Sequence, residues 1–139
     1  MSKRNNESFI STYIELDKLC CTKFGVSAGG VTEYINRLNN ARYAPGRDDV
    51  LPQLIKYRNK RNKFAHEPRS VRSDDDIGKE DLKWVARFKH DVQKRRDPIS
   101  KYLKKARRYA RRRRLRRFLI IALIIAAIVG AVAAYLVLK

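Results

Sequence analysis

The stretch "VLPQLIKYRNKRNKFAH" (residues 50–66) decides the fold class, because its apolar residues recur at helical spacing. On a helical wheel, these apolar side chains fall within about 60° of a single position, Arg61. They are Val50, Leu54, Tyr57, Phe64 and Ala65. The pattern predicts an amphipathic helix, capped by Asp48 or Asp49 and ending near His66, with an arginine near the centre of its apolar stripe.

Arg61 is the unusual residue of this predicted helix, since burying an arginine is costly unless the charge is paired or reaches water. One explanation is an ion pair with a carboxylate from the first helix. Another is a buried stem whose guanidinium reaches solvent. Lys60 and Lys63 lie about 100° or more from Arg61 on the wheel, where solvated lysines are expected.

Three other segments in the first 95 residues show the same helical spacing of apolar residues. They are residues 7–25, with Gly25 as the stop, residues 31–43, and a helix from Asp76 that carries Ile77, Leu82, Val85, Phe88 and Val92. No alternation typical of strands competes with them. The sequence therefore predicts an all-α protein whose residues 1–95 form a four-helix domain. The core is thin at this size, so dimerisation would help to stabilise it.

The charge of the chain is concentrated after this domain. The 139 residues carry a net charge of +19, and residues 95–117 alone contain 13 basic residues and one acid. Such a balance predicts an anionic partner, either nucleic acid or anionic membrane lipids. The two cysteines, Cys20 and Cys21, are adjacent and lack metal-binding spacing, so we expect small buried side chains in a reducing compartment.

The last segment, "FLIIALIIAAIVGAVAAYLVL" (residues 118–138), contains no charged residue. As a helix its 21 residues would be about 31 Å long, which matches the hydrocarbon core of a bilayer. We predict a single-pass C-terminal membrane anchor. The basic residues before it predict that the N-terminal domain is cytoplasmic.

Residues 96–117 are predicted to form a basic juxtamembrane helix that serves as a stalk, with Asp97 as N-cap and Pro98 in the first helical position. Two interpretations of its charge remain open. The basic run sets the membrane topology and attracts anionic headgroups, or it binds RNA phosphates beside the domain.

Polar groups suited to phosphate chemistry gather towards the end of the third predicted helix. Arg58, Asn62 and His66 are spaced i, i+4, i+8 and share one side, close to Arg61. A histidine can take the proton of an RNA 2′-hydroxyl or return one to the leaving group, and an arginine can stabilise the charge on phosphorus. This chemistry needs no metal and no cofactor, and no second histidine flanks His66 to form a metal site.

The stretch "RNKFAHEP" (residues 61–68) resembles the signature of the HEPN superfamily, an arginine followed by a polar residue and then, four to six residues on, a histidine. The resemblance covers the N-terminal domain and not the tail. It implies an up-and-down helical bundle that usually forms a homodimer, with two copies of the motif facing each other across one cleft. Carried over, Arg61 and His66 would be catalytic and Asn62 would orient the substrate. Helix geometry and charge add Arg58 and Lys63 as RNA contacts.

We therefore expect a membrane-anchored, metal-independent endoribonuclease that cleaves single-stranded or looped RNA. Antiviral defence or stress is the expected setting, with the nuclease acting as a toxin restrained by an unlinked regulator or antitoxin. The alternative is a non-catalytic membrane protein that binds partners or RNA, or whose apolar helix perturbs the bilayer. Small residues in that helix, among them Ala126 and Gly130, could pack against a second copy.

Overall fold

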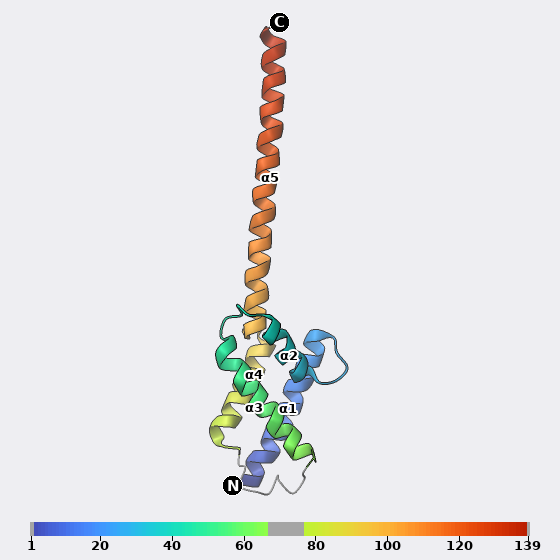
Figure 1. The fold of residues 1–139 in the computed structure, drawn as a ribbon, viewed down its shortest axis with the longest axis vertical. Helices are drawn as coiled ribbons and strands as arrows, with labels where there is room; N and C mark the ends of the chain where they lie inside the picture. Colours follow the sequence, from blue (N-terminus) through green and yellow to red (C-terminus); the bar gives the residue numbers. More distant parts are fainter. Residues whose placement is uncertain (1, 67–76, 139) are drawn as a thin grey trace. The chain divides into compact units, whose positions relative to one another are not determined.

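The computed structural model describes residues 2–66 and 77–138, and every regular element in these residues is an α-helix (Figure 1). The helices are α1 (Ser2–Phe24), α2 (Gly30–Asn40), α3 (Arg47–His66), α4 (Lys79–Gln93) and α5 (Pro98–Leu138). The prediction of an all-α protein with four helices and one long apolar C-terminal helix is confirmed. Residues up to Tyr102 form one compact unit, and residues 103–139 form a second.

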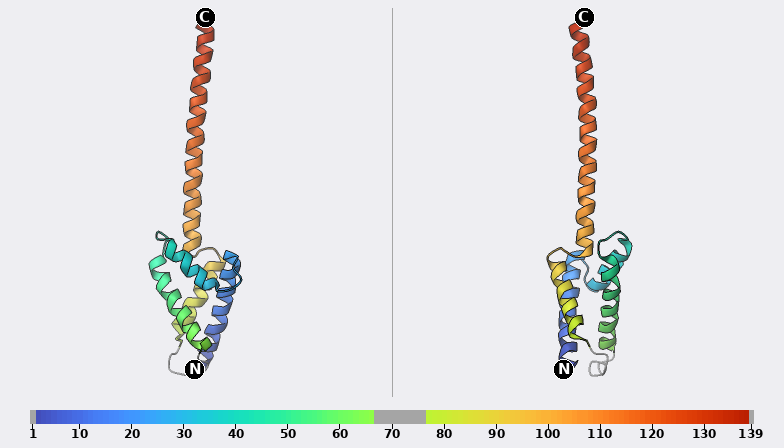
Figure 2. Two further views of the ribbon diagram at one scale, coloured as in Figure 1. Left: turned by 45° about the vertical axis from the view of Figure 1, so that its right-hand side comes forward. Right: turned by 90° about the vertical axis from the view of Figure 1, so that its left-hand side faces the viewer.

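In the first unit, α1 packs against α2 and α4, and α2 also packs against α3 (Figure 2). The closest approach joins α1 to α2, since a Cβ atom at Gly30 would collide with the backbone of Asp17 and Cys21. The Asp17 carboxylate accepts a hydrogen bond from Val31 N at 2.8 Å, which satisfies a free backbone donor at the start of α2. Glycine at position 30 therefore allows α1 itself to cap α2.

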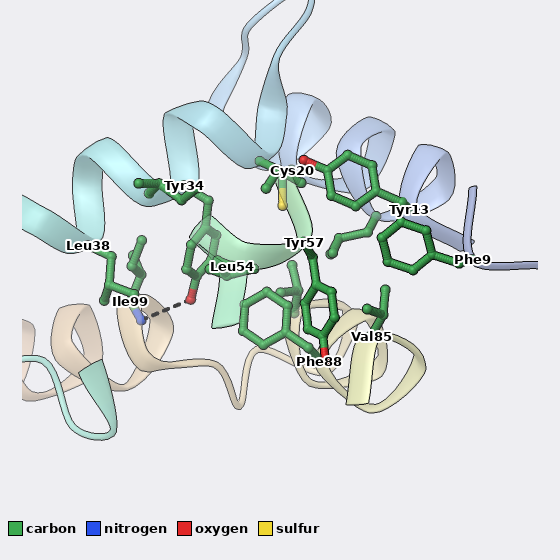
Figure 3. Packing of buried hydrophobic residues seen from close by; sticks show 14 of the residues in the cluster. Phe9, Tyr13, Cys20, Tyr34, Leu38, Leu54, Tyr57, Val85, Phe88 and Ile99 are labelled. Carbon is green, nitrogen blue, oxygen red and sulfur yellow. Dashed lines mark hydrogen bonds between the residues drawn. The ribbon is translucent and has the colours of Figure 1, made fainter. Parts of the chain in front are cut away.

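The core of this unit is rich in aromatic rings (Figure 3). The Tyr34 and Phe88 rings meet edge to face at 5.3 Å, and Trp84 stacks on Phe88 at 5.2 Å. Cys20 is buried and Cys21 is half-buried, and both are free thiols. Large rings fill this small domain, which has few residues with which to build a core.

Several predicted helix boundaries are wrong: α1 begins at Ser2 and not at residue 7, and α2 ends at Asn40 and not at residue 43. α3 begins at Arg47, directly after Gly46 at φ +75°, so Asp48 and Asp49 lie inside its first turn instead of capping it. α4 begins at Lys79, so Ile77 is not part of it. Ile77 is instead buried ahead of the helix, where its backbone N–H donates to Asn6 Oδ1 at 3.1 Å. The predicted cap Asp76 lies outside the described residues.

The start of α5 is held by Asp97, as the sequence predicts, through a bond from Ser100 N to Asp97 Oδ2 at 3.2 Å. The sequence did not indicate that this carboxylate is buried and holds the domain together. Asp97 also accepts hydrogen bonds from Lys23 Nζ at 2.7 Å, Tyr34 OH at 2.7 Å and Ser100 Oγ at 2.6 Å. Burial alone would raise the pKa of Asp97, but the bonds from Lys23, Ser100 and Tyr34 outweigh burial and hold this pKa below its ordinary value.

Replacing Asp97 with asparagine is expected to lower the free energy of unfolding by about 3 kcal/mol, because Lys23 is left without its partner. A carboxyl with a lowered pKa stabilises the fold above its unfolded pKa of about 4, and this contribution is lost as the pH falls through the folded value. The free energy of unfolding of the variant should therefore fall less than that of the unaltered protein as the pH is lowered. Urea unfolding followed by Trp84 fluorescence measures both effects.

The matched control for this variant is Asp91→Asn, because Asp91 forms an exposed pair with Arg96 at 3.5 Å. Exposed ion pairs contribute little to stability, so the free energy of unfolding is expected to change by less than about 0.5 kcal/mol. Equal losses of unfolding free energy in Asp97→Asn and Asp91→Asn would contradict the role assigned to Asp97.

Candidate functional site

The helix that carries the predicted site, α3, is joined to α1 and α4 by aromatic rings (Figure 3). The Phe64 ring meets Phe9 edge to face at 6.2 Å, and the Tyr57 ring lies 5.8 Å from Phe9 and 5.2 Å from Trp84. Leu54, Tyr57 and Phe64 are buried, which confirms most of the apolar stripe predicted for this helix, whereas Val50 is half-buried and Ala65 is exposed. The rings fix which side of α3 faces the core, and with it which side is left to solvent.

A polar contact fixes the middle of α3 to the first turn of α4. Asp81 Oδ1 accepts hydrogen bonds from Tyr57 OH at 2.7 Å and Lys56 Nζ at 2.9 Å, and Asp81 Oδ2 accepts from Gly78 N at 3.1 Å. Burial would raise the pKa of Asp81, but the hydrogen bonds from Lys56 and Tyr57 hold it below its ordinary value. Asp81 therefore caps α4 and orients α3 at the same time.

The last two turns of α3 expose the polar groups that the sequence singles out. Arg61, Asn62, Lys63 and His66 are exposed, and Arg58 is half-buried. His66 is the last residue of α3. All five predicted site residues thus lie on the final nine positions of one helix, within reach of a ligand from solvent.

Of the two explanations offered for Arg61, the structure favours a guanidinium that reaches solvent, because the side chain is exposed. The position shares the side of Leu54, Tyr57 and Phe64 on the wheel, and the long stem of an arginine lets its guanidinium reach water from there. Among the described residues, Arg61 forms no ion pair with a carboxylate of α1. Its recorded hydrogen bond is a long one, from Nη1 to Asn62 Oδ1 at 3.4 Å.

The other arginine of the site, Arg58, is held as loosely as Arg61. Its Nη2 lies 3.5 Å from Asn59 Oδ1, at the limit of a hydrogen bond. No carboxylate in residues 2–66 or 77–138 is recorded as its ion-pair partner. Because the site arginines are not engaged in short charge-assisted bonds, their donors are available to an external anion such as phosphate.

Tyr13 of α1 is a neighbour of this site that the sequence did not single out, since its position in an apolar stripe marks it only as core. Its side chain is buried. Burial and the charge of Asp17 raise the pKa of Tyr13, while the positive charges of Arg61 and Arg58 oppose the rise. The two arginines therefore lie near the Tyr13 phenol, on the side of α3 that faces α1.

A single α3 does not bring Arg61 and His66 to one point. Residues five positions apart are separated by about 140° around a helix and about 7.5 Å along it. Arg58, Asn62 and His66 are closer to one line, since each step of four residues turns by only about 40°. An arginine and a histidine that act on the same phosphate must therefore come together across two helices or through a substrate that wraps around α3.

No group of three His, Cys, Asp or Glu side chains in the described ranges is arranged to hold a metal ion. The other histidine of the chain, His90, is exposed on α4 and lies 3.1 Å from Arg96 Nη2 through its Nδ1. It is placed away from the predicted site residues in sequence and on a different helix. His66 is thus the one histidine that belongs to the arginine-rich end of α3.

The second unit consists of the greater part of α5. In its basic portion every side chain from Leu103 to Arg117 is exposed. The portion that follows is long and apolar enough to cross a membrane, and the large apolar side chains that the structure describes there are exposed, among them Phe118 at 71% and Leu138 at 88%. An apolar surface of this extent is unfavourable in water, so the helix needs a lipid or protein environment.

The architecture thus combines a small all-helical domain, a cationic end of one helix, and a C-terminal helix with a membrane-length apolar stretch. Residues 7–118 match the family of unknown function DUF6548, and the chain belongs to that family. The matched range includes the whole of the candidate site and the basic portion of α5. No curated protein and no solved structure matches the chain.

Proposed function

We propose that the protein is a membrane-anchored endoribonuclease of the HEPN type, which cleaves single-stranded or looped RNA. The observation that carries this proposal is the end of α3, where Arg61, Asn62 and His66 are exposed together and the arginine has no carboxylate partner among the described residues. These are the positions of the HEPN signature. A phosphate at this end would meet a guanidinium donor and an imidazole that can transfer a proton.

In the proposed reaction the RNA 2′-oxygen attacks the adjacent phosphorus and the bond to the 5′-oxygen breaks. His66 accepts the 2′-hydroxyl proton or supplies a proton to the departing 5′-oxygen. Arg61 stabilises the added negative charge on the phosphorane, and Asn62 orients the substrate. Arg58 and Lys63 bind neighbouring phosphates. The products would be a 2′,3′-cyclic phosphate and a 5′-hydroxyl. An unpaired substrate is favoured because its nucleotides can adopt the in-line geometry.

The proposal includes a homodimer, and helix geometry gives the reason. Arg61 and His66 point in directions about 140° apart on α3, so two copies of α3 could complete one cleft that a single copy does not. The first compact unit exposes few large apolar side chains, chiefly Ile14 at 41% and Tyr43 at 88%. The dimer would then depend on contacts around α3 together with the high local concentration that a shared membrane provides.

Membrane anchoring by residues 118–138, with the N-terminal domain on the cytoplasmic side, is the second part of the proposal. The four arginines between Arg113 and Arg117 would sit against anionic headgroups and set this orientation. Anchoring would confine cleavage to RNA near the membrane. An unlinked regulator or antitoxin would restrain the nuclease until infection or stress releases it.

The direct test is to incubate the full-length protein, purified in detergent, with mixed RNA in EDTA and to analyse the ends of the products. We expect fragments with 2′,3′-cyclic phosphates, and no cleavage of a 2′-O-methylated copy of the same RNA, because the attacking hydroxyl is blocked. Cleavage of the methylated RNA, or products with a 3′-hydroxyl, would contradict the proposed chemistry.

The rival function is a non-catalytic membrane protein, and the exposed apolar surface of α5 is the observation that favours it. In that case the helical domain is an interaction module and α5 oligomerises or perturbs the bilayer. Toxicity in cells separates the two functions. A toxic effect that survives His66→Ala but disappears when residues 118–139 are deleted supports the rival.

A further inference from the structure

The side chains of residues 103–112 of α5, "LKKARRYARR", fall on two faces of the helix, one basic and one uncharged. Around the helix, the six basic residues fall within an arc of about 160°, and the four others occupy the opposite arc. The basic set is Lys104, Lys105, Arg107, Arg108, Arg111 and Arg112; the opposite set is Leu103, Ala106, Tyr109 and Ala110. From Arg113 to Arg117 this division reverses, because the four arginines fall within an arc of about 160° on the side that carries Ala106 and Tyr109.

Residues 103–112 and residues 113–117 lie at different distances from the membrane that residues 118–138 are proposed to span. α5 is unbroken from Pro98 to Leu138, and no glycine or proline lies between Ile99 and Val129 to bend it. The headgroup layer is roughly 5–7 Å thick on each side of a bilayer, which corresponds to about four or five residues of helix. Residues 113–117 fill that layer, and their four arginines suit contact with anionic headgroups.

The basic face of residues 104–112 therefore extends beyond the headgroups. Surface potentials decay over about 8 Å at physiological salt, so Lys104, Lys105 and Arg107 are largely outside the reach of anionic lipid. No acidic residue follows Asp97 in the chain. Within the part of the chain that the structure describes, none of the six basic side chains has a recorded ion pair or hydrogen bond. The end of this face farthest from the membrane is thus a row of unneutralised cations that lipid does not reach.

An aromatic residue borders this row. Tyr109 is 72% exposed and lies about 13 Å before Phe118 along the helix, too far out for an aromatic of the membrane interface. Lys105 and Arg112 are its i−4 and i+3 neighbours on the helix surface. Exposed aromatic rings flanked by cations suit single-stranded nucleic acid, because the ring stacks on a base and the cations hold the phosphates on either side.

We propose that residues 103–112 of α5 form a binding surface for single-stranded RNA, with Tyr109 stacking on a base and Lys105 and Arg112 holding its phosphates. The surface is separate from the end of α3, and it does not depend on cleavage there. It does rest on the membrane anchoring proposed above, because anchoring determines which cations lipid can reach. Its role would be to retain RNA beside the membrane, whether or not the same chain cuts it.

The test uses full-length protein in nanodiscs of phosphatidylcholine alone and a short fluorescent 2′-O-methyl RNA, which can bind but cannot be cleaved through its 2′-oxygen. Binding is measured by fluorescence anisotropy. Tyr109→Ala is expected to weaken binding about tenfold, while Tyr109→Phe binds like the unaltered protein, because stacking needs only the ring. Replacing Lys105 and Arg112 with glutamine should reduce the slope of log affinity against log salt by about 1.4.

Leu103→Ala is the matched control, since Leu103 is an exposed apolar residue of the same segment, at 44%, but lies about 120° from Tyr109. It should leave RNA binding unchanged. Equal effects of Leu103→Ala and Tyr109→Ala would overturn the proposal and indicate that the apolar face docks on lipid or on another helix. RNA binding that Tyr109→Ala does not change but Arg61→Ala abolishes would also overturn it, because RNA would then be held by α3 alone.

A second arm places the protein in nanodiscs that contain phosphatidylserine. RNA binding should persist, with at most a modest loss from repulsion by the anionic surface. Loss of RNA binding in these discs, together with unchanged binding in phosphatidylcholine discs, would show that lipid occupies the basic face, and would overturn the proposal for a native membrane.

Discussion

Replacing His66 with alanine is expected to slow RNA cleavage by about a thousandfold, the loss typical of removing a general acid or base. His66 is exposed at the last residue of α3, so its removal creates no cavity and exposes no core residue. The change should therefore act on the rate constant and not on folding. Initial rates with a fluorogenic single-stranded RNA in EDTA measure it, and circular dichroism checks that the helices are intact.

The chain offers a matched control in His90→Ala, since His90 is the only other histidine and is also exposed on a helix. His90 contacts Arg96 on the surface and is not part of the α3 site. Cleavage by this variant should equal that of the unaltered protein. If both variants cleave as fast as the unaltered protein, the activity comes from a contaminant or from other residues, and the role proposed for His66 is wrong.

Replacing both Ile124 and Ile128 with arginine is expected to release the protein from membranes. The two positions lie one helical turn apart near the middle of the apolar portion of α5, and both side chains are exposed, at 55% and 58%. Each arginine near the centre of a bilayer costs about 3 kcal/mol on the scale derived from insertion, so the pair shifts the insertion equilibrium by a factor on the order of 10⁴. Carbonate extraction of cell membranes, followed by detection of the protein in pellet and supernatant, gives the result.

Leu119→Arg serves as the control for the anchor, because it adds an arginine two residues after Arg117, at the edge of the apolar stretch. An arginine there can extend to the headgroups, so this variant should stay in the membrane pellet. Retention of the double variant in the pellet would mean that α5 is covered by protein and not by lipid. That outcome would also remove the basis for separating headgroup and RNA contacts along α5.

Much of the fold follows from local patterns. Apolar spacing in residues 50–66 was enough to predict α3, and Gly25, at φ +70°, ends α1 where the sequence placed the stop. Asp97 was predicted as a cap from its position before Pro98, and it is one. Starts of helices were less predictable, because a run such as Gly46–Arg47–Asp48–Asp49 offers several cap positions and contacts with other helices select among them.

For the candidate site, the sequence placed Arg58, Arg61, Asn62, Lys63 and His66 on one helix end, and the structure exposes four of them and half-buries Arg58. The sequence left two explanations open for Arg61, an ion pair or a guanidinium that reaches solvent, because a wheel gives direction and not the distance to the next helix. The structure favours the second, since the side chain is exposed and forms no recorded ion pair among the described residues.

The sequence by itself determined the helical class, the apolar C-terminal segment and the charge asymmetry, because each depends on neighbours a few residues apart. Only the tertiary structure decided what Asp97 and Arg61 do. Asp97 is buried against Lys23 and Tyr34, residues 74 and 63 positions away, whereas Arg61 reaches solvent from an apolar stripe. Both outcomes depend on which side chains, far away in the sequence, pack beside a residue. The local spacing of residue types does not encode that arrangement.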